Sequence, residues 1–196
     1  MKFKKLVVLI VLMAVLAGLA VFKRLSLEKA RKSDAGVLQS QVDLDKGFST
    51  GFVSKIDLYR GTSQDERIIF VKDSSGVWRL ENRYRTRARK ESVESLLKLV
   101  GSLRGELRSE TDAVLEDFSL TDEKAIHLVF FDASGKELSH ILLSPLRPRG
   151  TQNFVRKASS KEVIATDKDV LAELGIFSKD DKMSVKTYAD LRVAGI

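Results

Sequence analysis

Residues 6–22 form an uninterrupted run of 17 apolar or small residues, with three lysines before it and Lys23 and Arg24 after it. Unpaired backbone polar groups are costly in hydrocarbon, whereas a helix pairs them within one segment. At about 1.5 Å per residue the run spans roughly 26 Å, and the flanking cations can bridge the rest of a core about 30 Å thick. The sequence therefore predicts a transmembrane anchor over residues 1–24.

A cleaved signal peptide is the alternative interpretation of this run, since Ala17, Gly18 and Ala20 offer small residues at workable spacing. The apolar core is, however, longer than the ~7–15 residues usual in signal peptides. A long domain that follows such a first segment crosses the membrane largely regardless of its charge. We therefore expect a single-pass protein with residues 25–196 outside the cytoplasm, beginning with a juxtamembrane helix and a stalk at 25–50.

The pattern after the stalk predicts a folded domain over residues 51–178, followed by an edge strand or tail over 179–196. Rough alternation of apolar and polar residues between turn-forming residues is typical of half-buried strands. The predicted strands are 52–59, 67–72, 77–80, 107–109, 125–131, 138–143, 153–157 and 162–165. Helical spacing predicts an amphipathic helix over 91–103 that stops before Gly105, and a short helix that begins with Asp167 as its N-cap and ends at Leu174.

These elements indicate an α+β fold: an N-terminal transmembrane helix, then a mostly antiparallel sheet with two packed helices in two strand-strand-strand-helix units. The 43% hydrophobic content is sufficient for a core. One sheet face is expected to meet the helices, with the sheet residues Val53, Ile69, Trp78, Leu128, Phe130 and Ile141 and the helix residues Val93, Leu97, Val100 and Leu171.

Six short segments, in this order, carry a resemblance to a known family: Val53–Ile56, Gly76–Leu80, Ser92–Leu97, Leu115–Leu120, Asp132–Lys136 and Val163–Ala165. Through their order and spacing, residues 52–192 resemble a bacterial family of extracytoplasmic domains, domain of unknown function 4340. The chain departs from the family at Ser119, where glycine is usual, and at Glu123 and Lys124, where a proline is usual. The resemblance implies an accessory envelope role beside gliding-type ABC exporter components, without known catalysis, at the bacterial inner membrane with the domain in the periplasm.

The segment 83–90 is the most unusual local feature, because arginines alternate with other residues and a lysine follows. In an extended strand this alternation places the guanidinium groups on one face, as a linear array suited to phosphate or carboxylate. The alternative interpretation is a solvated edge strand whose charges oppose aggregation. The candidate anion- or partner-binding residues are Arg83, Arg85, Arg87, Arg89 and Lys90, joined by Arg147 and Arg149 if the 145–150 loop lies nearby.

The remaining patterns favour a protein without catalysis, metal or cofactor. His127 and His140 are expected on one face of a hairpin that turns at Ser134 and Gly135, but zinc needs three or four protein ligands. The chain contains no cysteine, and therefore no thiolate site or disulfide. It also lacks a G-x-S-x-G, a glycine-rich phosphate loop and an H-E-x-x-H motif.

These features predict a non-enzymatic, membrane-anchored extracytoplasmic module that acts as an accessory or scaffold subunit of a membrane complex, such as an ABC-type exporter. Its expected partners are the lipid bilayer and other membrane proteins, an ABC-type permease or envelope subunits, and no nucleic acid. The alternative is a binding module for anionic lipid or an envelope polymer, which the net charge of +7 suits. An enzyme of unrecognised type is a third hypothesis, which would need a deep pocket with convergent polar groups.

Overall fold

A computed structural model describes residues 41–43, 49–147, 152–178 and 181–190, all of which belong to a unit that begins at Gln41. The predicted anchor at 1–24, most of the predicted stalk and Arg149 lie outside the described residues. Within the described ranges, no helix has the length and apolar character that crossing a membrane requires.

Ten strands and two α-helices make up the described part of the chain. The strands are β1 (Gln41–Asp43), β2 (Lys55–Arg60), β3 (Ser63–Lys72), β4 (Trp78–Leu80), β5 (Thr86–Arg87), β6 (Arg104–Ser109), β7 (Ile126–Phe131), β8 (Glu137–Leu143), β9 (Phe154–Lys157) and β10 (Val163–Thr166). The helices are α2 (Lys90–Val100) and α3 (Val170–Glu173), with 3-10 turns η1 (Thr50–Phe52), η2 (Asp112–Val114) and η3 (Val185–Thr187). The sequence pattern predicts eight of these strands but neither β1, which falls within the predicted stalk, nor β5.

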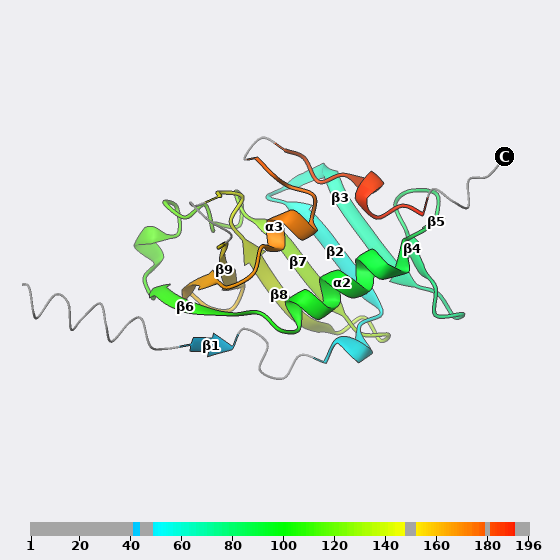
Figure 1. Ribbon diagram of the computed structural model, residues 1–196, viewed down its shortest axis with the longest axis horizontal. Helices are drawn as coiled ribbons and strands as arrows, with labels where there is room; N and C mark the ends of the chain where they lie inside the picture. Colours follow the sequence, from blue (N-terminus) through cyan, green and yellow to red (C-terminus); the bar gives the residue numbers. More distant parts are fainter. Residues whose placement is uncertain (1–40, 44–48, 148–151, 179–180, 191–196) are drawn as a thin grey trace, which may run out of the picture. The chain divides into compact units, whose positions relative to one another are not determined.

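A single sheet in the order β1-β6-β10-β9-β8-β7-β2-β3-β4-β5 contains all ten strands, and α2 and α3 lie across one of its faces (Figure 1). Every strand pair is antiparallel. The predicted mostly antiparallel sheet with two helices is therefore confirmed. The two halves are unequal, however, because β2–β5 precede α2 whereas five strands, β6–β10, precede α3.

The main core lies between the sheet and the helices. From the helices, the buried residues are Val93, Leu96, Leu97, Val100, Val170 and Leu171. From the predicted sheet side, Val53, Trp78, Leu128, Phe130 and Ile141 are buried in the same cluster.

The prediction that Ile69 belongs to this core face is wrong. In the β2–β3 ladder Asp57 lies opposite Ile69, whereas Ile56 lies opposite Phe70. Directly opposed residues share a face, so Ile69 lies with Asp57 on the second face of the sheet, while Ile68 and Phe70 enter the core. A run of three apolar residues does not by itself indicate which of them points inward.

A smaller apolar cluster covers part of the second face. It is formed by Leu120, Ala125, Leu142 and Val163, with four partly buried residues around them. Leu142 lies opposite His127 and therefore faces away from the main core. The segment 112–125 packs onto this part of the sheet through Leu120, which is fully buried.

Both helices are shorter than predicted. The first ends at Val100 with Gly101 as its C-cap, and Gly105 lies within β6 instead of ending the helix. The N-cap of α3 is Asp169, whose carboxylate accepts the Ala172 N–H at 3.0 Å, and not Asp167. The backbone of Asp167 continues the sheet instead, because its N–H donates to the Arg104 carbonyl.

The described part of the C-terminal segment, residues 181–190, reaches β5 only at its end, where the Asp190 N–H donates to the Arg87 carbonyl. In place of the predicted edge strand, this segment forms one isolated β-bridge, between Ala88 and Ala189. Tyr188 fixes this segment, since its ring is 1% exposed and its hydroxyl donates to the Glu173 carbonyl at 3.1 Å. Burial raises the pKa of the Tyr188 phenol far above its ordinary value, so the hydroxyl remains a donor.

Candidate functional site

The predicted anion-binding segment begins in the loop between β4 and β5, and Asn82 fixes the base of that loop. The Asn82 amide nitrogen donates to the Arg67 carbonyl at 2.6 Å, and the Asn82 amide oxygen accepts the Ile69 N–H at 3.2 Å. The Glu81 N–H donates to the Ile69 carbonyl at 2.8 Å. Three hydrogen bonds therefore hold the loop against β3. Asn82 is a positioning residue that the sequence pattern did not single out.

The tip of this loop is a tight turn in an unfavourable backbone conformation. The Arg83 carbonyl accepts both the Thr86 N–H at 3.0 Å and the Thr86 hydroxyl at 2.7 Å. Between them, Tyr84 and Arg85 have φ values of 54° and 53°. Two consecutive positive φ values define a type I′ turn, which prefers Asn-Gly and is sterically costly for Tyr-Arg. The turn presents a Tyr84 side chain that is 102% exposed.

The prediction of one extended strand with four guanidinium groups on one face is wrong. The turn reverses the chain after Arg83, only Thr86 and Arg87 lie in a strand, and Arg89 is already the N-cap of α2. The alternating sequence therefore forms a turn, a two-residue strand and a helix start. Anion binding by these residues remains a prediction, but it has to proceed from a hairpin tip.

The cationic side chains of this segment differ in their partners. Arg89 donates to the carbonyls of Lys186 and Thr187 at 3.0 and 2.9 Å, and so helps to hold η3. Arg85 forms an exposed ion pair with Glu81 at 3.5 Å, a kind of pair that contributes little. Arg87 is exposed and has no side-chain partner among the described residues. Arg85 and Arg87 are therefore the members of this segment that are most available to a ligand.

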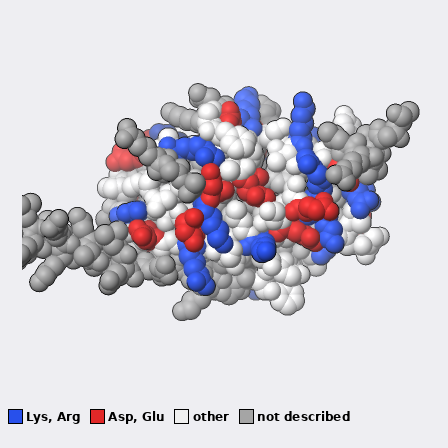
Figure 2. All heavy atoms as spheres, in the orientation of Figure 1, with Lys and Arg blue, Asp and Glu red and all other residues white. Residues whose placement is uncertain are grey.

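The remaining members add less to this surface. Arg83 donates to the neighbouring Asn82 carbonyl at 2.9 Å, and Lys90 lies 3.6 Å from Glu94 in an exposed pair. Over the face that carries the helices, Lys and Arg side chains are interspersed with Asp and Glu (Figure 2). The cationic character is therefore local to the hairpin rather than a property of the whole face.

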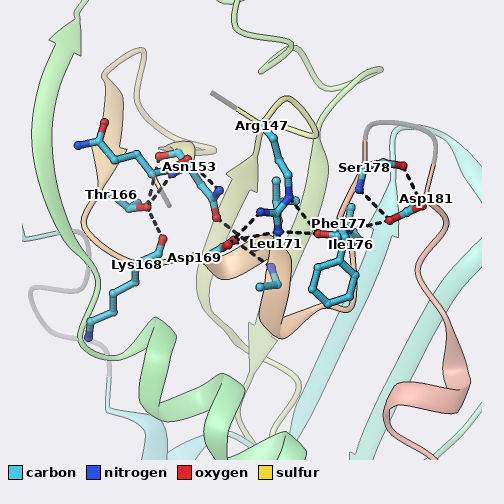
Figure 3. A network of polar contacts seen from close by, with 12 residues as sticks. Arg147, Asn153, Thr166, Lys168, Asp169, Leu171, Ile176, Phe177, Ser178 and Asp181 are labelled. Atoms are coloured by element: carbon cyan, nitrogen blue, oxygen red, sulfur yellow. Dashed lines mark hydrogen bonds and ion pairs between the residues drawn. The ribbon is translucent and has the colours of Figure 1, made fainter. Parts of the chain in front are cut away.

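Arg147 belongs to a different network, which surrounds α3 (Figure 3). Its guanidinium donates to the two Asp169 carboxylate oxygens at 3.0 and 3.2 Å and to the Ile176 carbonyl at 2.7 Å. It also lies 5.8 Å from the ring centroid of Phe177. These contacts hold the two ends of α3 together. The structure therefore does not bring Arg147 together with the hairpin.

A second polar cluster lies on the sheet face opposite the helices. His127 Nδ1 and His140 Nε2 are 2.9 Å apart, which confirms the prediction that both imidazoles lie on one face of their hairpin. His127 Nε2 lies 2.8 Å from the Asp122 carbonyl, and a carbonyl only accepts, so this nitrogen carries the proton. In the neutral pair, His127 Nδ1 is then the acceptor and His140 Nε2 the donor.

The environment of this cluster shifts the pKa values of His140 and Tyr59. Burial, followed by the nearby His127, lowers the pKa of His140 below its ordinary value, so His140 is neutral at pH 7. Tyr59 stacks on His127 at 4.5 Å between ring centroids, and burial followed by the charge of Asp57 raises the pKa of Tyr59. Among the described residues, no three His, Asp or Glu side chains are arranged to hold a metal ion.

The sequence pattern also gave no sign of a shallow cavity of about 530 Å³ between η1, β4 and α2. Trp78, Leu97 and Gly101 line it, and Lys72 Nζ lies 5.8 Å from the Trp78 ring centroid. An added Cβ at Gly101 would lie 2.7 Å from Thr50 Cγ2, so a larger residue at the end of α2 would displace Thr50, which also lines the cavity. It is a groove at the beginning of the folded domain.

A sequence model of one family, described as "Domain of unknown function (DUF4340)", matches residues 78–181. This range covers slightly more than half of the chain, and it contains the hairpin, both helices and the histidine pair. It also confirms the resemblance to this family, although Val53–Ile56 and the start of Gly76–Leu80 lie outside the matched range. No curated protein and no solved structure matches the chain.

Proposed function

The chain belongs to the DUF4340 family, and from this membership and its N-terminal sequence we propose that it is a membrane-anchored extracytoplasmic module. In this proposal residues 6–22 span the bacterial inner membrane once, and the folded domain lies in the periplasm. The module is non-enzymatic and serves as an accessory or scaffold subunit of a membrane complex, such as an ABC-type exporter.

The observation that carries the proposal is the short stretch of chain between the apolar run and the sheet. Only 16 residues, 25–40, separate Arg24 from Gln41, the first residue of β1. Fully extended, such a stretch reaches at most about 58 Å. A domain on so short a tether meets the bilayer surface and its membrane proteins at a high effective concentration.

The β4–β5 hairpin gives such a module a contact element. Strained backbone conformations cluster at binding sites, where the surrounding structure maintains them. Tyrosine is enriched at membrane–water interfaces, and arginine is attracted to anionic lipid headgroups. Tyr84 and Arg85 are residues of these two types, both have a strained backbone with positive φ, and the Tyr84 side chain is fully exposed.

Photo-cross-linking in native membranes tests this function. The full-length chain, with a photoreactive amino acid in place of Tyr84, is expressed in bacterial cells and its adducts are identified by mass spectrometry. We expect the adducts to include integral membrane proteins that lie beside the tip at the bilayer surface. The matched control replaces Ser134, at the exposed tip of the β7–β8 turn, and should not give the same adducts. Recovery of the chain in the soluble fraction without membrane adducts would contradict the proposal.

The alternative function, binding of anionic lipid or an envelope polymer, is favoured by the availability of Arg85 and Arg87. Guanidinium groups donate in a fork that matches two phosphate or carboxylate oxygens. Replacing Arg83, Arg85, Arg87 and Arg89 by glutamine should then weaken the adhesion of the domain to anionic surfaces. Unchanged adhesion would exclude this alternative.

A further inference from the structure

We propose that the tip of the β4–β5 hairpin contacts the surface of the bilayer, with Tyr84 among the headgroups of anionic phospholipids and Arg85 and Arg87 on their phosphates. This inference rests on the proposed function, because it requires a domain tethered near the membrane. It goes further in naming the element that makes the contact and the chemistry that the contact recognises.

The side chains of the tip match the polarity of a membrane interface. A tyrosine combines an apolar ring with a polar hydroxyl, and this amphipathic character concentrates it at the headgroup level. The Tyr84 ring is fully exposed instead of packing on the domain. The Arg87 side chain has no partner among the described residues, and the Arg85 side chain has only the exposed Glu81. Both guanidinium groups can therefore turn to phosphate without breaking a buried contact.

The backbone holds the tip ready for contact. The hydrogen bonds of Asn82 fix the loop to β3. The two hydrogen bonds that the Arg83 carbonyl accepts from Thr86 close the turn. A preorganised element loses less conformational freedom when it binds. The positive φ values at Tyr84 and Arg85 are a standing cost to the folded domain. Asn-Gly would fit this type I′ turn without that cost. A contact made by the Tyr84 and Arg85 side chains explains why these residues are present instead.

The shape of the tip favours a lipid surface over an acidic protein. A stable protein interface buries about 800 Å² on each partner, which is far more than one exposed aromatic ring and two arginines provide. A tethered domain needs only a weak contact with the bilayer, because the tether supplies the effective concentration. Residues 81–90 contain five cations and one anion. Each cation near an anionic leaflet strengthens such a contact about fivefold.

Tryptophan fluorescence of the full-length chain in lipid nanodiscs tests the inference. Tyr84→Trp keeps an interfacial aromatic at the tip, and the signal of the buried Trp78 is subtracted by using the unsubstituted chain. The discs contain phosphatidylcholine alone or with about one third phosphatidylglycerol, since anionic headgroups should strengthen the contact. Brominated acyl chains report the depth of the added tryptophan. The matched probe at a different loop is Ser134→Trp.

In anionic discs we expect the emission of the Tyr84→Trp variant to shift to shorter wavelength and to be quenched by brominated lipid. High salt should reverse both effects, and adding Arg85→Gln with Arg87→Gln should weaken the contact at least tenfold. Removing two other exposed cations, by Lys98→Gln with Lys136→Gln, should leave the signal unchanged. The Ser134→Trp probe should remain in water.

Four results would overturn the inference. The first is emission that is the same in both kinds of disc and in detergent. The second is a shift caused equally by soluble glycerol phosphate, which would indicate a free phosphate ligand. The third is a shift that appears only when membrane proteins are added, which would indicate an acidic protein partner. The fourth is a chain that does not enter the discs at all, which would overturn the proposed anchor as well; the first three leave the anchor intact.

Discussion

At the scale of single residues, the sheet depends on positions where no larger side chain fits. Gly105 in β6 is such a position, because an added Cβ would lie 2.4 Å from the Ala165 carbonyl oxygen and 2.6 Å from Ile164 Cγ2. Both contacts belong to β10, the strand with which β6 pairs. A side chain at this position has to push the two strands apart.

Gly105→Ala is therefore predicted to lower the free energy of unfolding by about 1–3 kcal/mol, the range usual for overpacking. Urea unfolding followed by circular dichroism measures the change. The matched control is Gly51→Ala, because the nearest atom to its added Cβ is Ser49 Oγ at 3.9 Å. Equal stability of the two variants would contradict the close approach of β6 and β10.

The histidine pair predicts a pH dependence of stability. Because burial and His127 lower the pKa of His140 in the folded domain, the unfolded chain binds a proton more readily at this position. Stability should therefore be complete above the ordinary histidine pKa of about 6.5 and should fall as the pH decreases below it. Thermal unfolding between pH 7.5 and 5.5 measures this slope.

His140→Gln removes the titrating group and should flatten the slope in that interval. The carboxylates of Asp73 and Asp132, whose pKa values hydrogen bonds lower, lose their contribution only in more acidic solution. A slope that is the same in the parent chain and in His140→Gln would contradict the half-buried, neutral imidazole of His140.

At the scale of elements, the strained turn of the β4–β5 hairpin lowers the stability of the domain while it exposes the Tyr84 side chain. Replacing Tyr84 by Asn and Arg85 by Gly provides the residues that a type I′ turn prefers. The double variant is predicted to raise the free energy of unfolding by about 1–3 kcal/mol, since each strained residue costs about that order. Arg85→Gln keeps the positive φ and should leave stability within about 0.5 kcal/mol. A double variant no more stable than Arg85→Gln would mean that the turn is not strained.

The elements that sequence patterns predict well are the ones with regular spacing. Alternation of apolar and polar residues locates β2, and spacing by three and four residues locates α2, because burial on one face imposes these periods. The pattern fails where it is uniform, as at Ile68, Ile69 and Phe70, and where two residues are equally suited, as with Asp167 and Asp169 at the start of α3. It also misses β1 and β5, which are too short to show a period.

The conformation of the arginine-rich segment could not be predicted from its residue pattern. Alternating arginines are compatible with a strand, but a turn closed by Thr86 and fixed by Asn82 overrides that preference. These hydrogen bonds join residues whose proximity only the completed sheet creates. The histidine pair could be predicted because both histidines lie on one hairpin, whose turn sets the register.

At the scale of the whole domain, the β2–β7 ladder joins the two halves of the sheet into one body. Arg147 and Tyr188 then connect α3 with the segments that flank it. The hairpin tip therefore projects from a support that is continuous across the sheet. In the proposed function, such a support transfers a contact at the tip to the domain as a whole.

The central claim is that residues 1–24 hold this domain outside the cytoplasm. A reporter enzyme that folds only outside the cytoplasm, fused after Ile196 in bacterial cells, tests it most directly. We predict that the fusion with the native sequence is active and membrane-bound. The double variant Leu12→Arg with Val15→Arg, which places two charges in the apolar run, should lose activity. The control double variant, Leu12→Ile with Val15→Leu, should retain it. A fusion that is inactive with the native sequence, while the matching cytoplasmic reporter is active, would contradict the account.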